Sequence, residues 1–397
     1  MINLELPEEL KAQKAFFHDL AEKLFRPISR KYDEAEHTYP EELDVMRPAL
    51  QPEVEEKTKA APPLKPTPKK NRPNYTALSG AISTEEFAWG CNGLLATIPG
   101  SGLGNSAINA VGSVEQKKKF GKMWCAMALT EPEFGSDPAS IRTSAKLDGD
   151  HYVLNGEKIF VTCADRCDAV VVWATLDHKL GRPAMKSFVV EKETPGFKLE
   201  HLEHKLGIRA SDTGTFVLKD VRVPKENLLG SPEISKEKGM AGVGKTFDSV
   251  RPMIAAQSVG IARAALDFFR EKLEEAGYVL DYKKNIHNVN SLVKEYYVME
   301  ATLDTIRLLS WKALWMLDNG LRNSAESSMS KGKGGCDGTW IVQKCCDLLG
   351  AMGFSRKYLV EKWMRDVKIT DIYDGTGQIQ RLIVSRQILG LSRDQLK

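Results

Sequence analysis

The chain has 397 residues, of which 42% are hydrophobic and 27% are charged, and its formal net charge is only +3. This length allows more than one packed core, and the composition is that of an ordinary globular protein. Because lysine and arginine are spread along the chain, the sequence lacks the concentrated basic surface that nucleic-acid binding requires, and no apolar stretch approaches the roughly eighteen residues of a membrane span.

Residues 1–124 are predicted to form an N-terminal helical domain. Apolar residues such as Leu10 and Leu20 recur at helical spacing, with charged residues between them. The stretch at residues 52–73 is rich in proline and lysine, and proline lacks the N–H group that a helix needs. We therefore expect residues 52–73 to form an extended surface loop within this domain.

Residues 125–238 are predicted to form a middle β domain. Short β-branched and aromatic runs occur at residues 169–174, 188–190 and 216–218, and turn formers such as Asn155-Gly156 separate the runs. Strand–helix–strand units would place a helix-length apolar period between the strands, and none is visible. We therefore expect an antiparallel sheet.

Residues 239–397 are predicted to form a C-terminal helical bundle. Leu303 and Ile306 belong to an apolar series with the three–four spacing of a bundle face. Glycine-rich stretches at residues 332–338 and 350–353 are predicted to mark helix ends. The fold class is thus α+β, with a helical domain, an antiparallel β domain and a second helical domain in chain order.

The cysteines and the N-terminus bear on the cellular compartment. The seven cysteines do not follow the spacing of a zinc or redox motif, so no metal site is predicted and reduced, structural cysteines are expected. The N-terminus lacks the basic-then-apolar layout of a signal peptide. Both observations favour a cytoplasmic protein.

Several stretches match the motifs of one known family, in the right order and at the right distances. The first reads ALTEPEFGSD at residues 128–137, and the last reads IYDGTGQIQR at residues 372–381. The others lie at residues 155–162, 205–213, 221–229, 247–252 and 361–368. Together they closely resemble the acyl-CoA dehydrogenase family, over roughly residues 75–392.

The resemblance implies an FAD-dependent enzyme of fatty acid metabolism that dehydrogenates an acyl-CoA thioester. In this family a carboxylate takes the proton from Cα while a hydride leaves Cβ for flavin N5. Asp374 occupies the position of that carboxylate, and its own backbone N–H would stabilise the thioester carbonyl. The resemblance further implies electron transfer to an electron-transferring flavoprotein, and a homotetramer or a heterotetramer with a paralogue.

The resemblance also implies roles for individual residues, carried over position by position from the family motifs. The residues implied to contact FAD are Leu129, Thr130, Ser136, Phe160, Thr162, Thr376 and Gln378. The residues implied to contact the acyl-CoA are Ser136, Asp248, Arg251 and Gly375. Phe160 replaces the more usual tryptophan against the isoalloxazine face, and Thr162 is expected near N5.

The sequence departs from the family at the catalytic carboxylate, because Asp374 stands where glutamate is usual. Aspartate keeps the acid–base chemistry but shortens the reach by one methylene, and small misplacements are costly in proton transfer. Some family members carry the base on an earlier helix, but Val250 occupies that position here. Three interpretations stay open: a substrate that binds closer or in another pose, a 1,4 removal of hydrogens across a ring, or weak dehydrogenation in a chain with another role.

A second departure concerns the segment that family members extend toward the FAD of a neighbouring subunit. The usual Arg-x-Thr-Phe-Gly stretch and the following Gln are replaced by residues 276–280 (AGYVL) and His287-Asn288, which removes a charge-assisted contact with the pyrophosphate. Asp347 also stands where Gln is common. The alternative to an independent enzyme is therefore a non-catalytic or half-site subunit of a heteromeric acyl-CoA dehydrogenase. A third interpretation is another flavin reaction on the same fold, such as enoyl-CoA reduction.

Overall fold

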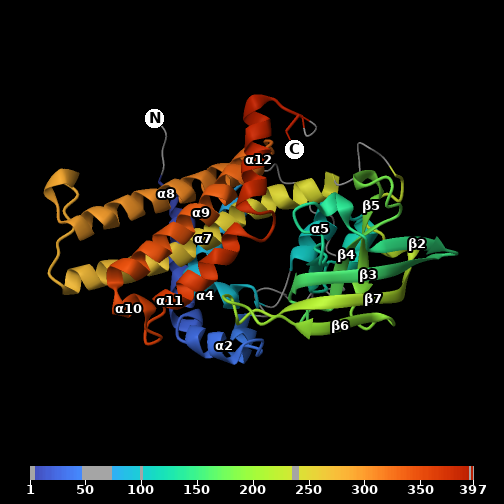
Figure 1. Ribbon diagram of the computed structural model, residues 1–397, viewed down its shortest axis with the longest axis horizontal. Helices are drawn as coiled ribbons and strands as arrows, with labels where there is room; N and C mark the ends of the chain where they lie inside the picture. The colour runs from blue at the N-terminus through green and yellow to red at the C-terminus, as the bar shows by residue number, and fades with distance from the viewer. Residues whose placement is uncertain (1–4, 47–73, 99–101, 235–240, 393–394, 397) are drawn as a thin grey trace, which may run out of the picture.

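The computed structural model describes residues 5–46, 74–98, 102–234, 241–392 and 395–396. In chain order its elements are helices, then strands, then helices, as the sequence predicted (Figure 1). The loop expected at residues 52–73 lies outside the described residues. Among the helices of the described ranges, none is long and apolar enough to cross a membrane.

The N-terminal helices pack around a small apolar core. They are α1 (Glu8–Leu20), η1 (Ala21–Phe25), α2 (Ser29–Ala35), η2 (Glu41–Met46), α4 (Thr76–Leu95), α5 (Leu103–Val111) and α6 (Val114–Phe120). Phe25 is fully buried and stacks on Phe87 of α4, with ring centroids 4.9 Å apart. Helix α4 in turn packs along the first helix of the C-terminal part, so the two helical regions share a boundary.

Seven strands form one sheet in the described part of the chain. They are β1 (Cys125–Ala128), β2 (Ser144–Asp148), β3 (His151–Thr162), β4 (Ala169–Thr175), β5 (Met185–Glu191), β6 (Phe197–Leu202) and β7 (Thr213–Pro224), with the 3-10 turns η3 (Pro138–Ser140), η4 (Arg182–Ala184) and η5 (Lys225–Asn227) between or after them. The hydrogen-bonded order is β1-β4-β2-β3-β7-β6, with β5 on β4.

The sheet is mixed rather than wholly antiparallel. Most pairs are antiparallel, as expected, but β1 and β4 pair in parallel, with Cys125 opposite Ala169. β2 also meets β4 in parallel, through Ser144 and Thr175. All seven residues of β4 are buried, which is typical of a strand covered on both faces. The run of apolar residues in β4 is consistent with this burial but carries no information about strand direction, so the parallel pairs could not be predicted.

The C-terminal part is a bundle of helices, as predicted. It contains α7 (Ala241–Glu275), η6 (Ile286–Asn288), α8 (Ser291–Asp318), α9 (Ser324–Leu349), α10 (Ala351–Phe354), α11 (Val360–Val367), η7 (Lys368–Asp371) and α12 (Gly377–Leu389). Ile261, Ile306 and Ile341 are fully buried where α7, α8 and α9 meet. Helix α7 runs from the sheet to the opposite end of the molecule, and α12 stands beside the ends of α8 and α9 that lie nearer the sheet (Figure 1).

The glycines at residues 332–338 lie inside α9, so the prediction that they mark a helix end is wrong. Helix α9 continues to Leu349 and ends before Gly350, which has a positive φ of 57°. The internal glycines allow close approach of neighbouring elements instead. A Cβ at Gly335 would lie 2.6 Å from the Cα of Asp371, and a Cβ at Gly338 would overlap Ser258. The close packing of α9 therefore requires glycine at positions 335 and 338.

We expect Gly335→Ala to destabilise the protein by about 1–3 kcal/mol, because the added methyl group meets backbone that has no room to move. Cys336→Ala is the matched control, since Cys336 is the next residue of α9 and is exposed. The control is expected to change stability by less than about 0.5 kcal/mol. Thermal unfolding of both variants measures the difference, and equal midpoints would contradict the steric argument.

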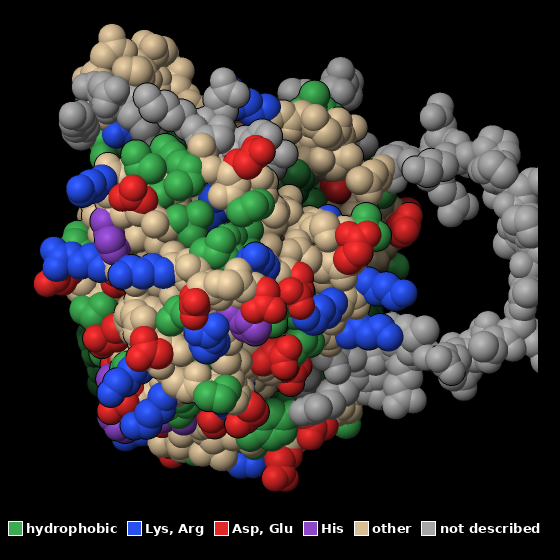
Figure 2. Space-filling model, turned by 90° about the vertical axis from the view of Figure 1, so that its right-hand side faces the viewer, with side chains coloured by type: hydrophobic (Ala, Val, Ile, Leu, Met, Phe, Trp, Pro, Cys, Tyr) green, Lys and Arg blue, Asp and Glu red, His purple; other side chains and the backbone are tan. Residues whose placement is uncertain are grey.

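The surface carries both signs of charge. Figure 2 shows the face at the sheet end of the molecule, where acidic and basic side chains are interspersed. This distribution agrees with the formal net charge of +3 for the whole chain.

Candidate active site

Asp374 lies in a tight turn between η7 and α12. Asp374 and Gly375 both have positive φ, 53° and 92°. The φ of Gly375 lies in a region that other residues rarely adopt, and a Cβ there would also lie 2.7 Å from Nε2 of Gln380, so the turn favours glycine. Thr376 caps α12, and its Oγ1 accepts a hydrogen bond of 3.3 Å from the Ile379 N–H. The turn thus presents the Asp374 carboxylate just before α12, which starts at Gly377.

The environment of Asp374 raises its basicity while keeping it ionisable. Asp374 keeps some contact with solvent, but the surrounding protein removes much of the water around its carboxyl and raises its pKa to about 6. The charges of Lys331 and Arg251 oppose this rise. Burial also lowers the pKa of Arg251. A carboxylate with a pKa near 6 is ionised at neutral pH and is a stronger base than an ordinary aspartate.

The predicted substrate residues Asp248 and Arg251 lie on one turn of α7 near Asp374. Arg251 Nη1 donates to Asp248 Oδ1 at 3.2 Å, and the Ser324 hydroxyl donates to Asp248 Oδ2. The Arg251 guanidinium also lies over the Phe247 ring, 5.5 Å from its centroid. The structure therefore brings Asp248, Arg251 and the Asp374 turn together, with Asp248 holding the arginine in place.

The predicted flavin residues of the β domain form a second group. Leu129 and Thr130 follow β1, while Phe160 and Thr162 end β3. The Ile159 N–H donates to the Thr130 carbonyl at 3.0 Å, which joins the two segments. Phe160 has a φ of 56° at an irregularity in the β3–β7 pairing, and its side chain is 60% exposed. The irregularity turns an aromatic ring outward beside the two threonines.

A buried ion pair between Lys158 and Glu131 lies next to this group. Lys158 is fully buried, and its Nζ donates to Glu131 Oε1 at 2.7 Å and to the Leu129 carbonyl at 3.1 Å. The Glu131 carboxylate also accepts the N–H groups of Arg142 and Thr143. Sequence reasoning assigned no role to this pair. Its polar atoms are paired, which fixes the backbone between β1 and η3.

An apolar contact connects the two groups. Leu129 packs in the same cluster as Phe247, the residue before Asp248, around the buried Trp173. The β residues and the α7 residues therefore border one region of the molecule. Ser136 and Gln378 are both exposed, and neither belongs to this apolar cluster.

Two buried residues at the site were missed by sequence reasoning. Lys331 of α9 and Gln380 of α12 both donate hydrogen bonds of 2.7 Å to the Gly375 carbonyl. The available signal was a lysine within a run of serine and glycine at residues 327–335. The small side chains of this run let neighbouring elements approach α9 closely.

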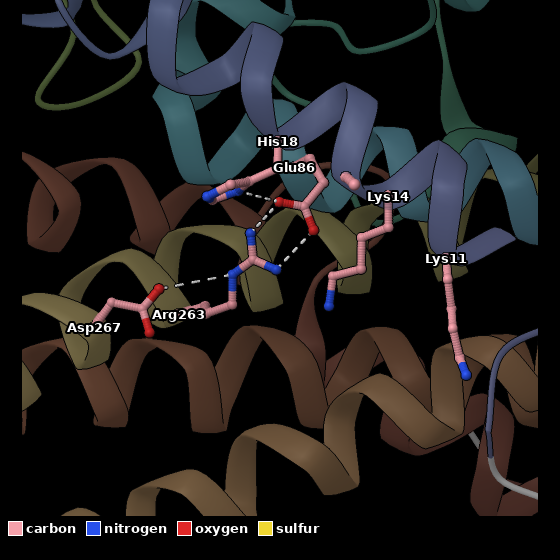
Figure 3. Close-up of a pocket in the computed structure, with 7 residues that line it drawn as sticks. Lys11, Lys14, His18, Glu86, Arg263 and Asp267 are labelled. Carbon is pink, nitrogen blue, oxygen red and sulfur yellow. Dashed lines mark hydrogen bonds and ion pairs between the residues drawn. The ribbon is translucent and has the colours of Figure 1, made fainter. Parts of the chain in front are cut away.

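A second cluster of charged residues lies away from Asp374. Lys11, Lys14 and His18 of α1 face Glu86 of α4 and Arg263 of α7 around a recess of about 390 Å³ (Figure 3). Its groups are paired: His18 Nδ1 lies 2.8 Å from Glu86 Oε2, and Arg263 Nη1 donates to Glu86 Oε1 at 2.8 Å. We interpret it as an ion-pair network that joins three helices.

Three possible metal ligands also lie close together in the described residues. The ligand atoms of Glu36, His37 and His204 are all within 4.8 Å of one another. Glu36, however, already accepts the Lys205 N–H and lies 3.4 Å from Nη2 of Arg209. The positive charge of Arg209 beside Glu36 disfavours a bound cation. We therefore interpret this group as a contact between the end of α2 and the loop before β7.

Comparison with known proteins gives consistent matches. The family model "Acyl-CoA dehydrogenase, middle domain" matches residues 126–221, and "Acyl-CoA dehydrogenase, C-terminal domain" matches residues 237–389. The short-chain specific acyl-CoA dehydrogenase of Clostridium acetobutylicum is 35% identical over 319 residues, covering 78% of this chain and 82% of the relative.

Solved structures match over nearly the whole chain. Butyryl-CoA dehydrogenase from Megasphaera elsdenii aligns with a TM-score of 0.82 and 29% identity, covering 98% of this chain and 100% of that one. A chain from a structure of the electron transferring flavoprotein of Acidaminococcus fermentans aligns equally well, with a TM-score of 0.82, 29% identity and the same coverage of 98% and 100%.

Proposed function

Because this chain belongs to the acyl-CoA dehydrogenase family, we propose that it dehydrogenates a short-chain acyl-CoA thioester with Asp374 as the base. The observation that carries the proposal is the Asp374 turn. It presents a carboxylate with a pKa raised to about 6 beside Arg251, in the region bordered by the predicted flavin residues. The relative from Clostridium acetobutylicum, named as short-chain specific, supports the substrate class.

The cofactor of the family is FAD, and the exposed side chains of the β domain suit it. The Phe160 ring is 60% exposed beside the half-buried Thr130 and Thr162. Neither threonine hydroxyl has a hydrogen-bond partner among the residues that the structure describes. An open aromatic face beside two free hydroxyls suits a flat ring system with polar edges. We assign Leu129, Thr130, Phe160 and Thr162 to the flavin ring, with Ser136, Thr376 and Gln378 toward the rest of the cofactor.

The bound FAD would supply an acceptor for the hydride that leaves Cβ. Asp374 removes the Cα proton, and its ionised form is the active one. The backbone N–H of Asp374 donates to the thioester carbonyl, where negative charge develops as the proton leaves. Arg251 is held by Asp248 beside the carboxylate, and Gly375 leaves room for the substrate because it has no side chain. The apolar cluster around Leu129 and Phe247 keeps water from this region.

The proposal is tested by purifying the chain and recording its visible spectrum, and then adding acyl-CoA thioesters without oxygen. We expect a flavin absorbance that butyryl-CoA bleaches faster than palmitoyl-CoA does. Free coenzyme A is the control and should leave the absorbance unchanged. Electron-transferring flavoprotein is the expected partner, and it should restore the absorbance of the reduced protein. A flavin that no thioester in the panel bleaches would refute the proposal.

A second candidate function is a half-site subunit that pairs with a paralogue. It is favoured by the connection between α7 and α8, which lies at the end of these helices far from the sheet (Figure 1). Val279 and Tyr282 are exposed there, and no arginine occurs in residues 276–290. A colourless chain that acquires flavin only when it is co-expressed with a paralogue would favour this candidate. A yellow homotetramer would favour the independent enzyme.

A further inference from the structure

A fully buried lysine contacts the backbone of the Asp374 turn. Lys331 reaches from α9, and its Nζ donates to the Gly375 carbonyl at 2.7 Å. Gln380, also fully buried, donates its Nε2 to the same carbonyl at 2.7 Å. Two donors from two helices thus hold the peptide group between Gly375 and Thr376, the N-cap of α12. This contact restrains the turn at the residue next to the carboxylate.

The surrounding sequence accommodates this contact. A Cβ on Gly332, the residue after Lys331, would lie 3.2 Å from Cβ of Gln380. A Cβ on Gly375 would lie 2.7 Å from the Gln380 amide nitrogen. Glycines at both positions therefore let α9, the turn and α12 come together around the carbonyl. A methionine or leucine could fill the volume of Lys331, but neither could donate a hydrogen bond.

The charge of Lys331 is costly to bury, and its electrostatic partners are the acidic residues of the turn. Burial lowers the pKa of Lys331 to about 8, while the charges of Asp374 and Asp371 oppose this fall. The ammonium group is bonded to a neutral carbonyl, so its charge is not cancelled by a bonded carboxylate. At neutral pH it remains mostly protonated.

The charged and titratable groups that face Asp374 come from three elements. They are Lys331 of α9, Arg251 of α7, and Tyr373 of the turn itself. Arg251 is already paired with Asp248, and the Tyr373 hydroxyl is bonded to Gln257. Of the two cations that face Asp374, Arg251 is bonded to another carboxylate, whereas Lys331 is bonded to a neutral carbonyl.

We propose that Lys331 is a positioning residue, which fixes the shape of the Asp374–Gly375 turn and supplies the positive charge that faces the Asp374 carboxylate. The proposal deepens the proposed function and rests on Asp374 as its base. The two contributions separate by mutation, because Gln380 shares the hydrogen bond but carries no charge. Lys331→Met removes the charge and one donor, while Gln380→Met removes only a donor.

The test compares Lys331→Met, Gln380→Met and the control Lys333→Met by the pH dependence of flavin reduction. Lys333 is partly exposed on the same helix and pairs with Asp337, so its variant should match the wild type. The wild-type rate should rise with pH through about 6, as Asp374 ionises. In Lys331→Met the pH at which the rate rises should increase by about one unit, because a positive charge that favours the ionised Asp374 is lost. In Gln380→Met the rate should fall while the pH at which it rises stays unchanged.

A readout without turnover separates failure of this proposal from failure of the proposed function. The carbon-13 signal of the Asp374 carboxyl is assigned by its absence in Asp374→Asn and titrated by NMR in the wild type and in Lys331→Met. A titration midpoint that moves upward in Lys331→Met supports the charge role even if no thioester bleaches the flavin. If both the pH at which the rate rises and the NMR midpoint stay unchanged while the flavin is bleached normally, the proposal is wrong and the dehydrogenase function stands.

Discussion

Replacing Asp374 with Asn is expected to slow flavin reduction by an acyl-CoA thioester by roughly 10³-fold or more, because the other groups around the site in the described residues are engaged elsewhere. Asp248 is bonded to Arg251 and Ser324, and Lys331 donates to the Gly375 carbonyl. Asn has the size of Asp but cannot accept a proton at neutral pH. Arg251 is a cation, and the Tyr373 hydroxyl has a pKa raised by burial and by Asp374, so neither neighbour can replace the base. Stopped-flow absorbance of the flavin measures the rate.

The matched measurement for this variant is substrate binding. Butyryl-CoA should still perturb the flavin spectrum of Asp374→Asn, since the turn keeps its glycine, its cap and the contact of Lys331 with Gly375. Loss of rate with retained binding assigns proton removal to Asp374. A rate within tenfold of the wild type would show that the base lies elsewhere in the chain. The variant Asp374→Glu then reports on reach, because it adds the methylene that most of the family carries.

The overall fold could be predicted from the sequence because its patterns are local. The three–four spacing around Leu303 and the apolar runs of β4 and β5 set the order of helices and strands. The motifs at residues 128–137, 155–162, 247–252 and 372–381 supplied the residues of the two groups, and their roles stay predictions. The parallel pairing of β1 with β4 could not be predicted, since a strand buried on both faces reads the same in either direction.

The glycines of α9 show why local rules fail where elements pack closely. In isolation, residues 332–338 have poor helix propensity, and ending a helix there is the expected outcome. In the fold, Gly335 is required by the backbone of Asp371, which lies 36 residues later in the chain. Lys331 was missed for the same reason. Its partner is a backbone carbonyl. The serine and glycine residues around Lys331 indicate close packing, but they do not show which backbone group the lysine would contact.

Replacing Arg263 with Met is expected to destabilise the protein by about 3–5 kcal/mol, because it leaves a buried carboxylate without its main partner. Arg263 donates to Glu85 Oε1 and Glu86 Oε1, each at 2.8 Å, and both carboxylates are almost fully buried. Although burial opposes ionisation, Arg307 and Arg263 hold the pKa of Glu85 at about 2. After the change Glu85 keeps Arg307, whereas Glu86 keeps only His18 among its bonded partners in the described part of the chain (Figure 3).

The midpoint of thermal unfolding should fall by about 5 °C in Arg263→Met, given the size of the chain. Arg270→Met is the control on the same helix, because Arg270 is half exposed and lies 3.9 Å from Asp267. Its midpoint should change by less than about 1 °C, as for most surface ion pairs. The double variant with Glu86→Gln should recover part of the deficit of Arg263→Met, because it removes the buried charge that has lost its partner. Equal midpoints for the two arginine variants would mean that water or a rearranged side chain satisfies Glu86, and the network would then contribute little to holding α1, α4 and α7 together.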